Sequence, residues 1–478
     1  MKSAKKLHSL FARPRWGMVL LLFTFVVVAT SCDDDDNDVQ PTQTQNIVQV
    51  AQSNSSLTTL VSALTKYPDL VTTLSSNGDF TVFAPTNAAF TNLLTAVGQA
   101  SIDDVPEDVL KNILQYHVIA TDELNASELT TGSLKTANTE DIAVTTAGGV
   151  KLNGAVNVTT ADVETTNGVV HIVDAVLVPP SIVPIVGTIV APAYFNKDFT
   201  TLIAAVKAAD PTILTTLLGN GPSGNGLTLF APTNAAFTAA GITSLPDQAT
   251  LNAVLTYHVI DGEVPASELP EESSVIPTLN GDFYLSNNGS SGVFINGTTE
   301  VVATDIAGSN GVVHIIDRTL LPPSKTIAEI GIDLSTSSTP QFTQLVAALS
   351  RTSGTANDLL AAVSNSNANL TVFAPTDEAF AQLYAALGVD NVDEIPLPTL
   401  TAVLQHHVIA ARVFSTDLVD GAAQTVNGEV TINAGDGTIT DESGNVASLN
   451  TNSALLNVLA TNGVIHTIDR VLLPESIF

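Results

Sequence analysis

Tryptophan, cysteine and basic side chains are scarce in this 478-residue chain, and each scarcity narrows what the protein can do. The single tryptophan, Trp16, lies in an N-terminal leader, so the rest of the chain lacks the large aromatic face on which sugars often stack. The single cysteine, Cys32, cannot form a disulfide within the chain. Five of the 16 Lys and Arg residues precede Cys32, which leaves 11 basic against 47 acidic residues. Nucleic acid and anionic lipid surfaces repel so acidic a body, and we expect neither as a partner.

Sequence motifs that carry catalysis or hold ions are missing as well. The chain contains no Gly-rich phosphate loop, no nucleophile elbow and no closely spaced histidine-rich metal motif. Residues 433–442, with Asp436 and Asp441, have the composition of a calcium loop without the EF-hand spacing, which favours a solvated hairpin. We therefore predict that the protein is not an enzyme and has no cofactor and no metal site.

The first 31 residues have the layout of an export signal peptide. A basic stretch precedes an apolar run from Met18 to Ala29, and small residues then lead to Cys32. The run is shorter than the ~20 apolar residues that a membrane-spanning helix needs. Cys32 resembles the lipid-modified cysteine of bacterial lipoproteins, although Ala29 stands where the usual pattern has a larger aliphatic residue. We predict lipid attachment, and so a membrane anchor, at Cys32.

Residues 32–45 form an acidic and polar segment that predicts a flexible stalk. The run from Asp33 to Asp36 resembles the surface-export signal of lipoproteins in some diderm bacteria. In other bacteria, an aspartate at that position retains the lipoprotein at the inner membrane. We expect an outer-membrane lipoprotein of the bacterial cell envelope that is exposed at the surface, and the periplasmic face remains the alternative.

Three sequence blocks recur in the same order three times along the chain. The first block is TVFAPTNAAF at 81–90, TLFAPTNAAF at 228–237 and TVFAPTDEAF at 371–380. The second is YHVI at 116–119, YHVI at 257–260 and HHVI at 406–409. The third begins NGVVHIVD at 167, NGVVHIID at 310 and NGVIHTID at 462. This period is too long for solenoid repeats, so we predict three self-sufficient domains, at residues 46–180, 181–323 and 324–478.

The first two blocks predict local structure. The first block predicts a strand that stops at Pro85 and a helix whose N-cap is Thr86. The second block ends a helix, and the histidine at its second position lies on the apolar face at the i, i+3, i+4, i+7 spacing. We therefore predict that His117, His258 and His407 are buried and hydrogen-bonded in the core.

The third block opens with the tight-turn signal Asn-Gly and continues as a strand rich in β-branched residues. Apolar residues on both faces predict a central strand that is covered on both sides. His171, His314 and His466 interrupt this strand, and each could share a zinc ion with the helix histidine of its domain. Two histidines without a carboxylate or thiolate at ligand spacing make a weak site, so we favour a structural role for all six.

Together, the FAPT block, the Tyr-His pair and the NGV-x-H strand resemble the fasciclin domain, a module of extracellular and surface proteins. The resemblance covers residues 46–478. It implies an α+β fold in which each of three tandem domains is a β-sandwich-like wedge with helices packed against it. It also implies adhesion to an extracellular or cell-surface protein or polysaccharide.

In animal members of this family, binding to integrins has been attributed to the Tyr-His region and to an Asp-Ile pair before the last strand. By position, the resemblance implies these candidate contact residues: Tyr116, His117, Asp162, Val163, Tyr257, His258, Asp305 and Ile306. The third domain departs from both motifs, with His406 for the tyrosine and Asn457-Val458 for the acidic pair.

Two functions are consistent with the sequence. The first is a lipid-anchored adhesion protein at the cell surface that acts through tandem domains without catalysis. The second is a periplasmic or envelope structural protein without an external ligand.

Overall fold

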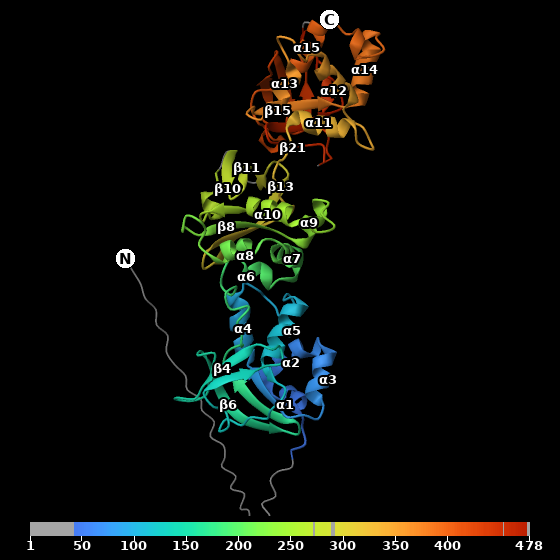
Figure 1. Ribbon diagram of the computed structural model, residues 1–478. Coiled ribbons are helices and arrows are strands. Elements are labelled where there is room, and N and C mark those ends of the chain that lie inside the picture. Colours follow the sequence, from blue (N-terminus) through green and yellow to red (C-terminus); the bar gives the residue numbers. More distant parts are fainter. Residues whose placement is uncertain (1–42, 271–272, 288–291, 453, 476–478) are drawn as a thin grey trace, which may run out of the picture. The chain divides into compact units, whose positions relative to one another are not determined.

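The computed structural model describes residues 43–270, 273–287, 292–452 and 454–475. The predicted signal peptide, the predicted lipid site Cys32 and most of the predicted stalk lie outside the described residues. Figure 1 shows helices and strands in each of the three domains.

The first domain places its helices and strands in one α+β unit. Its helices are α1 (Ile47–Ser53), α2 (Thr58–Thr65), α3 (Pro68–Ser75), α4 (Asn87–Ala96) and α5 (Glu107–Tyr116). Its strands are β1 (Phe80–Pro85), β2 (Val118–Ile119), β3 (Gly132–Lys135), β4 (Asp141–Thr145), β5 (Lys151–Leu152), β6 (Val156–Thr165) and β7 (Gly168–Val173). They form a seven-stranded sheet in the order β2-β1-β7-β6-β5-β4-β3.

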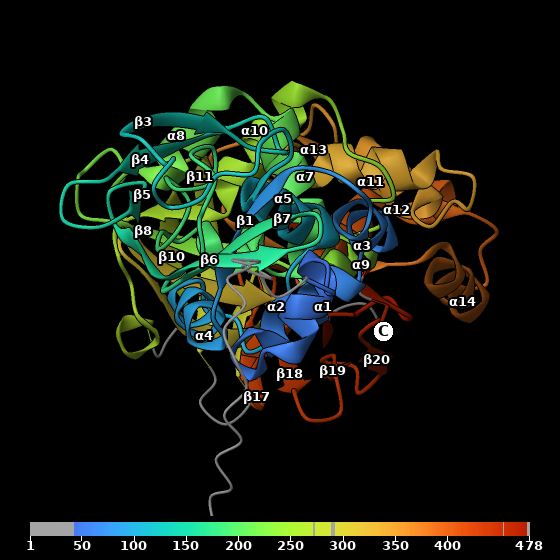
Figure 2. The same cartoon turned by 90° about the horizontal axis from the view of Figure 1, so that it is seen from below.

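Strand β7 is central, as its unbroken apolar sequence predicts. It pairs in parallel with β1 and antiparallel with β6. Val170 packs into the core under the helices, whereas Val173 packs into a second core with β4 and β5. Figure 2 shows α1, α2 and α3 on one side of β1, β6 and β7, with β3, β4 and β5 on the other. The predicted fold, a sandwich-like wedge with packed helices, is confirmed.

Strand β6 joins the two halves of this sheet and carries an irregularity. Its register against β7 shifts between Val158 and Thr160 and again between Thr160 and Val163. Asp162, inside the second shift, has a φ of 58°. Such a bulge bends a strand and increases its twist, which lets one half of the sheet turn across the other.

The second domain repeats this topology. Its helices are α6 (Ala191–Tyr194), α7 (Thr200–Ala208), α8 (Pro211–Leu218), α9 (Asn234–Ala239) and α10 (Gln248–Tyr257). Its strands are β8 (Leu227–Pro232), β9 (Val259–Asp261), β10 (Ser274–Thr278), β11 (Gly281–Asn287), β12 (Val293–Ile295), β13 (Thr299–Gly308) and β14 (Gly311–Ile316). The sheet order is β10-β11-β12-β13-β14-β8-β9.

The third domain divides the sheet in two. Its helices are α11 (Ile327–Ser335), α12 (Thr343–Arg351), α13 (Leu359–Ser364), α14 (Asp377–Leu387) and α15 (Leu397–His406). Its strands are β15 (Leu370–Pro375), β16 (Val408–Ile409), β17 (Gly421–Gln424), β18 (Glu429–Asn433), β19 (Thr438–Thr440), β20 (Val446–Ser448), β21 (Val458–Ala460) and β22 (Gly463–Ile468). They form two four-stranded sheets, β16-β15-β22-β21 and β17-β18-β19-β20, because short β21 stands where the other domains have a ten-residue strand.

Two local predictions have different outcomes. Thr86 is the N-cap of α4, and its hydroxyl accepts a hydrogen bond from the amide of Ala89. The predicted solvated hairpin at 433–442 is the β18–β19 turn, and Asp436 is exposed there. Asp441, however, is buried, because its carboxylate accepts hydrogen bonds from the amides of Asn445 and Leu473.

Among the described residues, no single helix has both the length and the apolar composition to cross a membrane. The segments Lys197–Ala208 and Pro211–Leu218 meet that test only as a pair, bent by 120°.

Candidate functional site

The helix histidine lies at the C-terminal end of α5, where the helix leaves its last carbonyl groups without partners. His117 is 2% exposed, and its Nδ1 lies 2.7 Å from the carbonyl oxygen of Ile113. Its Nε2 lies 2.9 Å from the backbone nitrogen of Leu177. Because a backbone amide can only donate, Nε2 accepts and Nδ1 carries the hydrogen that is donated to Ile113.

This arrangement fixes the charge and the tautomer of the ring. Burial lowers the pKa of His117 to about 4, so the imidazole is neutral at pH 7. The same two contacts and the same lowered pKa recur at His258, with Val254 and Leu320, and at His407, with Val403 and Leu472. The prediction that these three histidines are buried and hydrogen-bonded is confirmed.

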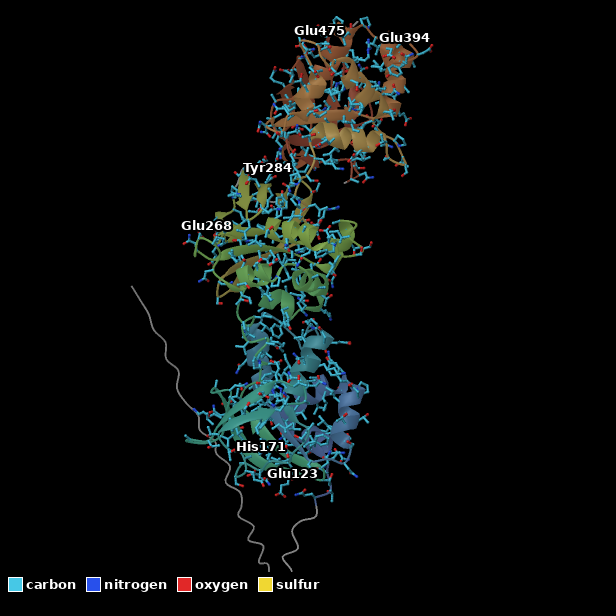
Figure 3. The ribbon with its side chains drawn as sticks, in the orientation of Figure 1. Glu123, His171, Glu268, Tyr284, Glu394 and Glu475 are labelled. Carbon is cyan, nitrogen blue, oxygen red and sulfur yellow. The ribbon has the colours of Figure 1, made fainter. Side chains whose placement is uncertain are left out.

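The strand histidine is also bonded through both ring nitrogens. His171, labelled in Figure 3, is fully buried on β7. Its Nε2 donates to the carbonyl oxygen of Leu124 at 2.8 Å, and its Nδ1 accepts from the amide of Asp162 at 3.3 Å. Burial lowers the pKa of this ring as well. His314 and His466 repeat these contacts with Val264 and Asp305 and with Val413 and Asn457.

These bonds bear on metal binding, because a ligating imidazole must offer a free lone pair. In each of the six recurring histidines, the one nitrogen that accepts is already bonded to a backbone amide. Within the part of the chain that the structure describes, no group of three or more His, Cys, Asp or Glu residues is placed to hold a metal ion.

The candidate tyrosines lie inside their domains. Tyr116 is fully buried, its hydroxyl donates to the carbonyl oxygen of Asp141 at 2.8 Å, and it accepts from the side chain of Asn153 at 2.9 Å. Tyr257 makes the equivalent contacts with Asp282 and Asn296. Burial raises the pKa of Tyr257 to about 12, so the phenol stays protonated.

The third domain has a histidine at the position of the tyrosine. His406 replaces the tyrosine, and its Nδ1 lies 2.6 Å from the carbonyl oxygen of Asn427. Its Nε2 is buried without a hydrogen-bond partner. The ring therefore fills the place of the phenol but leaves one of its two nitrogens buried without a partner.

The candidate Asp-Ile pair divides into an exposed and a partly buried residue. The side chain of Asp162 is 45% exposed, and its Oδ1 accepts from the amide of Ala126 at 2.6 Å. Asp305 accepts in the same way from the amide of Ala266 at 2.8 Å. Val163 and Ile306 instead pack against the core. The carboxylates are the exposed members of this pair, and the apolar members are partly buried.

Asn457 takes the place of the aspartate in the third domain and keeps its backbone conformation. Its φ is 57°, close to the 58° of Asp162 and the 60° of Asp305. Asn and Asp are the side chains that best accept this left-handed conformation after glycine. Asn457 also accepts from the amide of Ser415 at 2.7 Å, which reproduces the aspartate contact without the charge.

A further set of polar residues was not predicted from the sequence. Asn167, interpreted above as a turn residue, is buried, and its side chain accepts from the amide of Ile47 and donates to the carbonyls of Leu74 and Ser76. Asn310 and Asn462 hold the corresponding segments of their own domains. The recurrence of Asn beside Gly in all three copies was the available signal, but its turn propensity concealed the role in the core.

The comparisons with known proteins agree with this repeated geometry. The family described as Fasciclin domain matches residues 55–179, 197–322 and 340–474. The chain belongs to the fasciclin domain family. Its recurring histidines, tyrosines and asparagines therefore mark one fasciclin scaffold that is present three times in tandem.

Relatives of this fasciclin protein come from animals and bacteria. Transforming growth factor-beta-induced protein ig-h3 of Oryctolagus cuniculus is 29% identical over 448 residues, which is 91% of this chain and 58% of the relative. Human periostin is 28% identical over 74% of this chain and 40% of its own length. Protein sll1483 of Synechocystis is 40% identical over 28% of this chain and 73% of its own length. The chain thus spans little more than half of the first relative and less than half of periostin.

Proposed function

We propose that this protein is a lipid-anchored adhesion protein at the bacterial cell surface that binds a surface protein or a polysaccharide. The observation that carries the proposal is one fasciclin domain repeated three times, with its recurring polar side chains bonded within the fold. The fasciclin resemblance implies adhesion, and the chain shares this family with relatives such as ig-h3 and periostin. Tandem copies let several weak contacts act together, which supports a binding function.

The contact surface that we propose lies at the bulges of β6 and β13. Among the candidate contact residues, Tyr116, His117, Tyr257 and His258 are buried. Asp162 and Asp305 are the exposed members of the set, whereas Val163 and Ile306 are partly buried. We propose that these two carboxylates contact the ligand, and that the third domain, which has neutral Asn457 at this position, contributes little.

The test of this surface replaces each aspartate by asparagine, which is the residue that the third domain has at this position. Asp162→Asn combined with Asp305→Asn removes both charges and keeps an oxygen that can accept from Ala126 and Ala266, as Asn457 does from Ser415. Cells carrying this variant are expected to lose most of their attachment to protein- and polysaccharide-coated surfaces.

The matched control is Asp390→Asn with Asp436→Asn, which removes two exposed charges elsewhere and should leave attachment unchanged. Equal attachment of wild type and the Asp162/Asp305 variant would contradict the assigned surface. Unchanged attachment in cells without the protein would contradict the adhesive function itself.

The anchor is tested separately on intact cells. A membrane-impermeant reagent that reacts with amines is expected to label the wild-type protein on intact cells. The Cys32→Ser variant is expected to be absent from the membrane fraction, because it lacks the site of lipid attachment. Labelling only after the outer membrane is opened would favour the alternative, an envelope structural protein without an external ligand.

A further inference from the structure

The third domain contains an apolar cavity of about 140 Å³ between its first three helices and its sheet. Helices α11, α12 and α13 contribute Ile327, Leu345 and Leu359 to the walls, and strand β15 contributes Leu370 and Val372. Protein interiors are normally packed with few voids larger than a water molecule. A space of this size is therefore a specific feature of the domain.

The first domain has a smaller cavity, of about 80 Å³, at the corresponding position. The two positions can be matched because the side chains of Asn167 and Asn462 hold the carbonyl groups of Leu74 and Val363 in the same way. Three positions carry a smaller side chain in the third domain, which explains its larger volume: Ala51 against Gly331, Leu74 against Val363, and Phe80 against Leu370.

The lining determines which chemistry the cavity accepts. Gln405 and His407 are its polar side chains, and both ring nitrogens of His407 are already bonded. A buried water needs two to four polar partners, so the walls do not hold water well. A hydrocarbon of matching size restores the contacts that the wall atoms lack. An engineered apolar cavity of ~150 Å³ binds benzene, so this volume is sufficient for a small apolar group.

Apolar surface continues from the cavity to the outside. Ile332 and Val426 both line it, and they are 45% and 50% exposed. Each of these side chains therefore offers apolar surface outside the cavity to the part of a molecule that does not fit inside. The net charge of −31 disfavours an anionic head group. We propose that the third domain binds the chain of a single-chain, uncharged amphiphile, with the terminal carbons inside the cavity.

The proposal is tested by titrating the full-length chain with hexan-1-ol, octan-1-ol and decan-1-ol and following binding by saturation-transfer NMR. The affinity is expected to rise about fourfold with each added methylene group until the cavity is full. The smaller cavity of the first domain is expected to give a second, weaker component.

Gly331→Leu is the decisive variant. A β-carbon at Gly331 meets only Val346, at 3.9 Å, so a side chain can enter the cavity from α11 without a backbone clash. Leucine also favours a helix more than glycine does. The tighter component is expected to weaken at least tenfold, whereas Ala385→Leu, which adds the same bulk on the exposed face of α14, is expected to leave it unchanged.

A second variant guards against a packing failure of the first. Val363→Leu with Leu370→Phe gives the third-domain cavity the larger side chains that the first-domain cavity has at these positions. The affinity of the third domain for the alcohols is expected to fall to that of the weaker component. Absence of saturable binding in the wild type, affinity independent of chain length, or unchanged binding in both cavity variants would overturn the proposal.

Discussion

Each helix histidine closes the end of its own helix and also holds a backbone segment far along the chain. His117 bonds to Ile113 one turn earlier and to Leu177, which is 60 residues away. Such a ring makes both bonds only while it is neutral, because a protonated Nε2 could not accept from Leu177. The fold is therefore sensitive to the protonation of this side chain.

Lowering the pH from 7 to 5 is expected to destabilise all three domains. The folded-state pKa of His117, His258 and His407 is about 4, whereas the usual value is 6.5. Between these values the unfolded chain binds a proton that the folded chain does not, so the stability is complete above pH 6.5 and is lost as the pH falls toward 4. The loss by pH 5 is roughly 2 kcal/mol for each helix histidine. Midpoints of urea unfolding at the two pH values measure it.

His117→Gln supplies the control for this prediction. It removes one of the two buried titrating rings of the first domain and leaves His171, so the hydrogen-exchange protection of β1 should then depend less on pH than that of β15. Equal pH dependence of the two strands in this variant would contradict the assignment to the histidine.

Gly168 is expected to tolerate no side chain. Its φ is 143°, and a β-carbon there would lie 2.1 Å from the carbonyl oxygen of Phe80 on the parallel neighbour β1. Gly168→Ala must therefore separate two paired strands, and we expect a loss of more than ~3 kcal/mol in the free energy of unfolding. Gly149→Ala is the matched control, because φ is 112° there and nothing lies within 4 Å. Its cost should stay at about 1 kcal/mol, and equal costs for the two variants would show that the clash at Gly168 is relieved.

At the scale of elements, the bulge of β6 is expected to distinguish two substitutions at one position. Asp162→Ala loses the acceptor for Ala126 and places a side chain without polar atoms at a φ of 58°. We expect this to cost about 1–3 kcal/mol. Asp162→Asn keeps both properties and should be close to neutral. Thermal unfolding of the two variants measures the difference, and a similar loss in both would mean that the negative charge itself stabilises the bulge.

The sequence predicted the elements that depend on local patterns. The N-cap at Thr86, the apolar face that ends in His117 and the central strand β7 follow from capping preference and hydrophobic periodicity, which act over a few residues. The buried amide of Asn167 and the carboxylate of Asp441 were missed, because each has a partner far along the chain, Ile47 at 120 residues and Leu473 at 32 residues. Polar side chains with distant partners resemble turn residues in a single sequence, so their burial was not predictable.

The family resemblance indicated which residues could contact a ligand, and the structure shows which of these residues are exposed. Tyr116 and His117 form a recognisable motif in the sequence, but both side chains are buried in the structure. Asp162 is accessible because the bulge turns it outward from the strand pairing. Accessibility depends on the packing of a whole domain, which no local pattern reports.

At the scale of the whole molecule, negative charge is the dominant electrostatic property. The chain carries 47 acidic and 16 basic residues. Lysine and arginine side chains of the described residues form ion pairs with Asp69, Asp103, Asp104, Asp333 and Asp393. Such exposed pairs typically contribute little to stability, so repulsion among the remaining carboxylates outweighs them.

Added salt is therefore expected to stabilise the protein. The distance over which charges interact falls from ~30 Å at 0.01 M ionic strength to ~8 Å at 0.15 M, which screens repulsion between carboxylates on neighbouring elements. We expect the temperature of unfolding to rise by a few degrees across this range, measured by differential scanning calorimetry. Sodium chloride and sodium sulfate at equal ionic strength should agree, because screening depends on ionic strength and not on the anion. A fall in the unfolding temperature would mean that the few ion pairs outweigh the excess of negative charge, and that the acidic surface is arranged more favourably than its composition indicates.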